Sequence, residues 1–141
     1  EYTIYNAEYT SYLNDNVLSV VIKSTLKEGN NPQRVIVQTY NFDVKTGKKL
    51  SLNEVLEQQG IDEKEVNKKI EKQVEEANKR ANAISQAMMQ AGQSVYKRDI
   101  NNAMYVTDNV NYFLVGENGQ IYIIYPYGNT NFTSEMDIIK I

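Results

Sequence analysis

Two acidic residues near the C-terminus have a spacing that carboxylate chemistry could use. Glu135 and Asp137 are two positions apart in a segment of strand-forming residues, so both side chains should leave the same face of a strand. A carboxyl pair of this kind can supply a general acid and a general base, as in glycoside hydrolysis. Because most Asp and Glu side chains are exposed and solvated, we instead interpret this pair as surface or turn residues.

Histidine and cysteine are both absent from the sequence. The lack of histidine removes the commonest general base and metal ligand, and the lack of cysteine excludes thiol catalysis, disulfides and thiolate metal sites. Oxygen ligands for calcium could come from residues 108–111 with Glu117, but the spacing and the final glutamate of an EF-hand are missing. We therefore expect no catalytic residues, no metal site and no cofactor. The alternative is an enzyme that works with carboxylates and lysine.

Tyrosine, asparagine and phenylalanine gather in the segment around residue 130. Tyrosine gives rigid, amphipathic contact area and asparagine gives adaptable hydrogen bonds, and both are common in recognition surfaces. The alternative is ordinary packing within a sheet, since tyrosine is intermediate in burial. The candidate binding residues are Tyr125, Tyr127, Asn129, Asn131 and Phe132.

Composition and charge favour one globular domain, which we assign to residues 1–141. A chain of 141 residues with 41% apolar residues can bury one sizeable core but hardly two. Its formal net charge of −3 argues against a nucleic-acid partner, which would need a basic surface. No apolar run approaches the roughly 18 residues of a membrane span, so we expect no membrane insertion by this segment.

Five segments have the composition and the turn boundaries of strands that pair mainly antiparallel in one sheet. Residues 2–12 also contain strand formers, but the interruption at residues 6–8 leaves their register open. Between two of the segments, Asn118-Gly119 is a strong hairpin signal. The five segments are residues 17–26, 34–42, 113–115, 121–125 and 137–141.

Two capping boxes predict the starts of two helices. Ser51 and Glu54 precede a short helix at residues 52–59, and Asp62 and Glu65 precede a long one. Apolar residues then recur every three or four positions, which predicts a continuous helix over residues 62–91 with one face on the sheet. The stripe consists of Val66, Ile70, Val74, Ala77, Ala81, Ile84, Met88 and Ala91.

The alternative for this long helix is a dimeric coiled coil. Alanines in the stripe weaken that alternative, because large side chains drive helix pairing whereas small ones let a helix lie close to a sheet. We therefore expect a monomer. The expected fold class is α+β, with a mainly antiparallel sheet of about five strands and one long amphipathic helix packed on a face.

Residues 40–56 also carry a family resemblance. A strand that ends in Asn41-Phe42-Asp43 is followed by the Thr46-Gly47 turn, Leu50-Ser51-Leu52 and a short helix. This order resembles the extracytoplasmic domain family shared by peptidoglycan deacetylases and the lysozyme-sensing anti-sigma factors of Gram-positive bacteria. Most of the chain is consistent with the resemblance, including Tyr125-Pro126-Tyr127-Gly128 before the last strand.

The chain departs from the family pattern in two places. Members often carry a Gly-Gly-Ala-His-Pro-like turn where this chain has Glu28-Gly29-Asn30-Asn31-Pro32, so any role of that histidine is absent here. Members also usually have another strand and helix upstream, which we expect residues 1–141 to lack.

The resemblance implies a location and a class of function. It implies an extracytoplasmic domain, secreted or anchored through a segment outside these residues, that binds or senses an envelope protein or a cell-wall ligand without catalysis. An accessory domain of a peptidoglycan deacetylase or of another cell-wall enzyme is the alternative.

Overall fold

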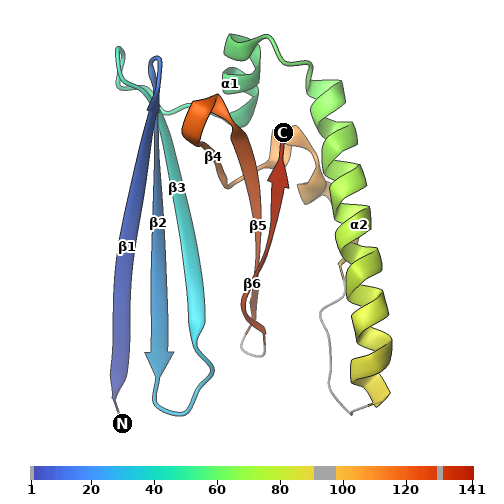
Figure 1. Cartoon of the computed structure of the whole chain (residues 1–141). Coiled ribbons are helices and arrows are strands. Elements are labelled where there is room, and N and C mark those ends of the chain that lie inside the picture. Colours follow the sequence, from blue (N-terminus) through green and yellow to red (C-terminus); the bar gives the residue numbers. More distant parts are fainter. Residues whose placement is uncertain (1, 91–97, 130–131) are drawn as a thin grey trace.

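The fold belongs to the α+β class and contains two antiparallel sheets. The computed structural model describes residues 2–90, 98–129 and 132–141, with the side chains of 85–90, 127–129 and 132–135 left out. Within these residues, six strands form two three-stranded sheets, accompanied by two α-helices (Figure 1). The expected single sheet of about five strands with one long helix is therefore wrong, although the α+β class is confirmed.

Sheet A consists of β1 (Thr3–Asn14), β2 (Val17–Glu28) and β3 (Arg34–Asp43), in that order. Both pairings are antiparallel and keep one register along their length, which settles the pairing of the first strand. Side chains alternate between two faces. The face that carries Ser19 and Asn41 is turned toward the second sheet, and we call it the inner face.

Sheet B consists of β4 (Phe113–Val115), β5 (Ile121–Asn129) and β6 (Phe132–Lys140), again in chain order and antiparallel. The predicted hairpin between β4 and β5 is confirmed. Its turn residues Asn118 and Gly119 both have positive φ, at 58° and 75°. Only glycine adopts such angles freely and asparagine tolerates them, which explains the strength of the signal.

The short helix α1 (Leu52–Gln59) begins with the predicted capping box. Glu54 N donates to Ser51 Oγ at 3.2 Å, and Ser51 N donates to Glu54 Oε2 at 2.8 Å. The bond from the Ser51 backbone and the contact with Lys48 lower the pKa of Glu54. The contribution of this carboxylate to stability is therefore present above the ordinary pKa of glutamate, and it is lost as the pH falls through the lowered pKa.

The long helix α2 (Glu63–Gln90) begins in a different way from the prediction. Asp62 Oδ1 accepts a hydrogen bond from Lys64 N at 3.0 Å, while Glu65 pairs with Lys68 at 2.9 Å. Asp62 thus caps the helix without the reciprocal bond from Glu65 that a capping box requires.

No described helix is long and apolar enough to cross a membrane.

The apolar stripe of α2 faces the core only in its first half. Val66 and Ile70 are fully buried, and Val74 is nearly so, whereas Ala81 is half-buried and Ile84 is 55% exposed. The prediction that the stripe faces a sheet is thus confirmed for the first turns and is wrong for Ile84. The predicted contacts of Met88 and Ala91 lie outside the described side chains.

Lengths explain where the contact ends. The helix has 28 residues and is about 42 Å long, whereas the nine-residue strand β6 beside it spans about 30 Å. Periodicity fixes which side of a helix is apolar, but it does not show how far the partner surface reaches.

The core joins both helices to sheet B and to the nearby end of sheet A. Two short 3₁₀ turns, η1 (Ala103–Tyr105) and η2 (Thr107–Asn109), lie in the segment before β4 and complete the core. Its buried members are Val17, Leu50, Leu52, Val55, Leu56, Val66, Ile70, Val74, Tyr105, Phe113, Val115, Ile121, Ile123, Tyr125 and Ile139.

The two sheets meet through a polar contact at the edge of β4. Phe113 N donates to Thr39 Oγ1 at 3.2 Å, and Phe113 O accepts from Asn41 Nδ2 at 2.9 Å. Val115 N donates to Ser19 Oγ at 3.0 Å, and Ser19 Oγ donates to Asn41 Oδ1 at 2.6 Å. Side chains of sheet A thus make the hydrogen bonds that a neighbouring strand would otherwise make with this edge of β4.

The same contact continues to the turn after β4. Asn14 Nδ2 donates to Gly116 O at 2.8 Å and to Val115 O at 3.3 Å. Ser19 is fully buried and Asn41 is 3% exposed, so water does not compete for these groups. Because a buried backbone group without a partner is costly, these bonds fix how the two sheets are docked.

The first prediction compares two isoleucines of α2. Ile70→Ala removes a fully buried side chain and should cost about 2–5 kcal/mol of unfolding free energy. Ile84→Ala is the matched control, and it should change that free energy by less than about 0.5 kcal/mol because Ile84 is exposed. Urea denaturation followed by circular dichroism measures both. Equal losses for the two variants would contradict the finding that α2 contacts the core at Ile70 but not at Ile84.

The second prediction tests the contact at the β4 edge. Asn41→Ala leaves Phe113 O without its donor and the Ser19 hydroxyl proton without its acceptor, and each such buried group costs about 1–3 kcal/mol. Gln38→Ala, at an exposed position of the same strand, serves as the control. Urea denaturation should show a clear loss for Asn41→Ala alone, and a loss as small as that of Gln38→Ala would refute the role of this contact.

Candidate functional site

Tyr125, which the sequence suggests as a binding residue, lies in the core. It is 4% exposed, and its ring packs edge-on against Tyr105 with centroids 4.8 Å apart. Burial raises the pKa of its hydroxyl, whose oxygen has no hydrogen-bond partner among the described residues. Tyr125 therefore serves packing, and as a buried side chain it cannot be a surface anchor.

The side chains of the other four candidate binding residues lie outside the described part of the structure. Tyr127 and Asn129 end β5 and Phe132 begins β6, so their backbones belong to sheet B, while their side chains lie outside the described residues. Asn131 lies outside them altogether. The suggested role of these four residues stays a prediction.

Asp137, one of the paired carboxylates, is held by an ion pair. Arg98 Nε and Nη2 donate to its two oxygens at 2.7 and 2.8 Å, and the two side chains are 13% and 9% exposed. A bidentate pair of this kind fixes the segment at Arg98 against β6. The side chain of Glu135 lies outside the described residues, so the pairing of the two carboxylates stays untested.

The suggested calcium ligands do not converge among the described side chains. Asp108 accepts a hydrogen bond from Asn53, and Asn109 donates one to Ala103 O at 2.7 Å. Glu117 lies in η3 (Glu117–Gly119), beyond β4. No group of three or more acidic side chains that could hold a metal ion occurs within the described part of the chain.

The outer face of sheet A, opposite to the inner face, carries several exposed apolar side chains. The alternation of side chains assigns odd-numbered residues of β1 and even-numbered residues of β2 and β3 to it. Leu13, Tyr9 and Ile36 are 64%, 77% and 45% exposed. The four cross-strand rows of this face are Ala7–Ser24–Ile36, Tyr9–Ile22–Gln38, Ser11–Val20–Tyr40 and Leu13–Leu18–Phe42.

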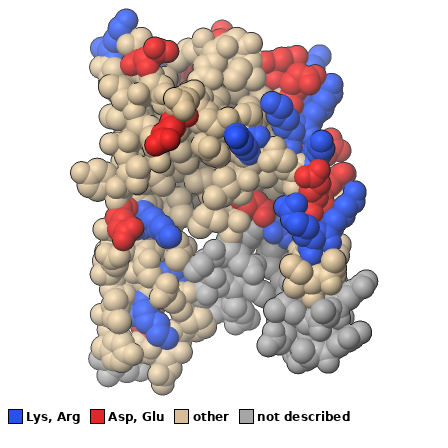
Figure 2. Space-filling model, in the orientation of Figure 1, with Lys and Arg blue, Asp and Glu red and all other residues tan. Residues whose placement is uncertain are grey.

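Charge is absent from these four rows. Glu28 and Arg34 lie on the same face beyond the last row, and they pair with each other at 3.1 Å. Elsewhere, Lys, Arg, Asp and Glu gather over α2 (Figure 2). Seven residues at about 3.3 Å and three strands at about 4.8 Å give these four rows roughly 330 Å² in projection. Apolar patches of about 300–600 Å² on soluble proteins are often functional.

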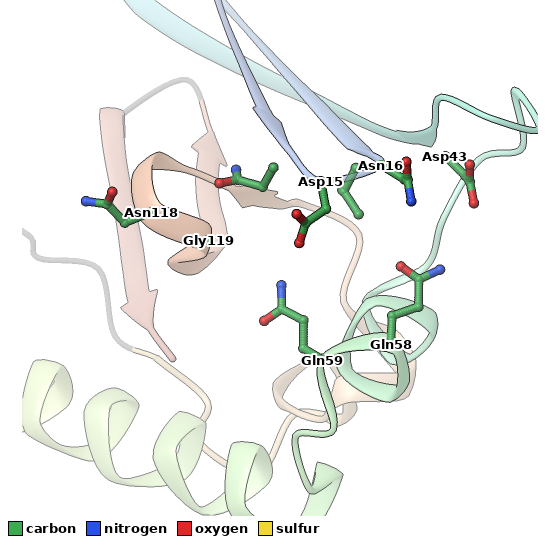
Figure 3. Close-up of a pocket in the computed structure, with 9 residues that line it drawn as sticks. Asp15, Asn16, Asp43, Gln58, Gln59, Asn118 and Gly119 are labelled. Carbon is green, nitrogen blue, oxygen red and sulfur yellow. The ribbon is translucent and has the colours of Figure 1, made fainter.

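A second feature is a polar pocket of about 550 Å³ between the β1–β2 turn, the end of α1 and η3. Asp15 and Gln59 point toward one another across it, whereas Asn118 points away (Figure 3). Asp43 belongs to the local turn, because its carboxylate accepts from Lys45 N at 2.8 Å. The lining residues are Asn14, Asp15, Asn16, Val17, Asp43, Gln58, Gln59, Asn118 and Gly119.

Carboxylate and amide groups in such a pocket could bind hydroxyl groups of a sugar. The side chains of Asp15 and Gln59 make no hydrogen bond within the described residues. No aromatic ring lines the pocket, so it offers no platform on which a sugar ring could stack. The pocket is therefore a weaker candidate than the outer face of sheet A.

Sequence reasoning missed the outer face, although a signal was present. The rows of the face follow from the alternation of side chains in strands that are bounded by turn-forming residues at positions 14–16 and 28–32. The missing information was which face of the hairpin is turned to the core. Comparison with known proteins adds nothing to this assignment, because no family model and no curated protein matches the chain.

The third prediction asks whether Asp137 stabilises the fold. Asp137→Ala removes the carboxylate partner of the nearly buried Arg98 guanidinium and should cost about 3–5 kcal/mol. Ile138→Ala, a neighbouring residue that is 56% exposed, should cost less than about 0.5 kcal/mol. Chemical denaturation checks both. If Asp137→Ala is as stable as the control, the ion pair does not hold β6 in place.

Proposed function

We propose that this chain is a noncatalytic extracytoplasmic domain that binds an envelope protein through the outer face of sheet A. The observation that carries the proposal is the set of four uncharged rows on that face, in which most side chains are aromatic or aliphatic. Interface centres are poor in charge and rich in tyrosine and phenylalanine, as these rows are. The aromatic loop residues suggested by the sequence are not needed for this surface.

The arrangement of the inner face supports the proposal. A free three-stranded sheet normally turns its apolar face inward and its polar face to water. In sheet A, the inner face uses Ser19, Thr39 and Asn41 to bind β4, while aliphatic and aromatic side chains face outward. A partner that covers the outer face would bury the apolar surface that the domain itself leaves exposed.

The extracytoplasmic location and the class of partner come from the family resemblance. The Asn-Phe-Asp, Thr-Gly and Leu-Ser-Leu segment resembles domains of lysozyme sensors and of peptidoglycan deacetylases. Lysozyme, as a protein that acts on the envelope, is therefore the first protein to test. The accessory role in a peptidoglycan deacetylase or another cell-wall enzyme remains the second candidate, and the polar pocket at Asp15 and Gln59 favours it because a glycan offers hydroxyl groups.

The fourth prediction uses two exposed isoleucines as a matched pair. Ile36→Lys places a charge in the outer face, whereas Ile84→Lys places the same charge on exposed α2. Calorimetric titration with lysozyme should show that Ile36→Lys weakens binding by about 30-fold, the equivalent of about 2 kcal/mol, with Ile84→Lys unchanged. Both variants should melt near the temperature of the parent chain.

Three outcomes separate the candidates. Equal binding by both lysine variants refutes the outer face as the binding surface. Retention on purified cell-wall sacculi that Gln59→Ala abolishes, without lysozyme binding, favours the accessory role. Release of sugar or acetate from sacculi by the repurified chain would refute the noncatalytic assignment.

A further inference from the structure

One edge of sheet A is open within the described residues. β1 pairs with β2 over 12 residues, and beyond it no described strand follows in the sheet. Gly29 N donates to Tyr2 O at 2.8 Å, so even-numbered residues bond to β2 and odd-numbered residues direct their N–H and C=O groups outward. The outward residues are Thr3, Tyr5, Ala7, Tyr9, Ser11 and Leu13.

The other edges of the two sheets make hydrogen bonds at some of their positions. β4 bonds to side chains of sheet A, as described above. At β6, the Gln73 side chain donates to Lys140 O at 2.8 Å and accepts from Lys140 N at 3.1 Å. At the end of β3, Leu50 N donates to Asn41 O at 2.8 Å. The long edge of β1 differs from these edges, because no described residue satisfies its outward groups.

β1 also lacks most of the residues that normally protect an exposed edge, apart from one inward-pointing charge at Glu8. Lys, Pro and bulges usually block the pairing of edge strands with other chains. The strand contains no Lys, Arg or Pro, and its single charged side chain, Glu8, lies on the inner face. Twelve residues at about 3.4 Å give an uninterrupted edge of about 40 Å, twice the length of an average strand.

We propose that two copies of the chain pair antiparallel through β1, about a twofold axis beside Tyr9. Outward groups bond only if odd-numbered residues face odd-numbered residues. An axis at Tyr9 meets this condition and places Ala7 opposite Ser11 and Tyr5 opposite Leu13. An axis at Glu8 would set two carboxylates against each other, which is unfavourable for a cross-strand pair.

This register uses almost the entire strand. It forms about 10 backbone hydrogen bonds, and on the outer face it pairs Tyr9 with Tyr9 and Tyr5 with Leu13. The two sheets A become one continuous sheet, and the two outer faces become one continuous surface. The proposed dimer differs from the monomer expected from the sequence, and it does not depend on the proposed binding of an envelope protein.

The fifth prediction concerns self-association, measured by sedimentation equilibrium over a wide range of concentrations. The parent chain should form a dimer. Ala7→Pro removes an outward N–H and no bond to β2, and it should raise the dimer dissociation constant at least about tenfold. Ala7→Thr keeps the N–H group and should leave dimerisation unchanged.

Cysteine variants provide a second readout if proline unfolds the strand. Because the chain has no cysteine, Tyr9→Cys and Ala7→Cys each introduce a single thiol. With oxidised glutathione, Tyr9→Cys should form a disulfide-linked dimer, since directly opposite Cα atoms lie about 5.5 Å apart. Ala7→Cys is the control, because the two copies of residue 7 lie four positions apart along the strands.

Two results would overturn the proposal. One is a monomer at every concentration together with equally slow cross-linking of both cysteine variants. The other is faster cross-linking of Ala7→Cys than of Tyr9→Cys, which would place the axis at another residue. Neither result would bear on binding by Ile36, because that residue lies on β3, two strands away from the proposed dimer axis.

Discussion

The docking of the two sheets depends on hydrogen bonds between side chains of sheet A and the backbone of β4. A three-residue strand has few groups with which to hold its place, and on one side it has only β5. On the other side, Thr39, Asn41 and Ser19 bond to the N–H and C=O groups of Phe113 and to the N–H of Val115. An apolar surface in their place would leave these backbone groups buried without partners.

This contact also determines the character of the rest of sheet A. Because side chains alternate along a strand, residues that point inward to bond β4 leave their neighbours pointing outward. On β2 the inward Ser19 lies between Leu18 and Val20, and on β3 the inward Asn41 lies between Tyr40 and Phe42. The buried face of this sheet is thus polar where it meets β4, and the face turned to water is apolar.

Local elements could be predicted from the sequence because their signals are local. The Ser51 and Glu54 capping box and the Asn118-Gly119 turn involve neighbouring residues, and both are as expected. The division into two sheets could not be predicted in this way. It depends on contacts such as that between Asn41 and Phe113, which are 72 positions apart, and an Asn within a strand does not reveal its partner.

The candidate binding residues show what residue type and strand periodicity can and cannot predict. The residue type of Tyr125 suggests a binding anchor, yet this residue follows Ile121 and Ile123 at every second position of β5, and both are buried. The alternation already placed its ring with the core. Residue type alone is therefore misleading where strand periodicity determines whether a side chain is buried. For sheet A, periodicity defines two faces but does not tell which is covered, since the covered face is the more polar one. Only the position of β4 decides this, and it leaves Tyr5, Tyr9 and Leu13 of β1 facing solvent.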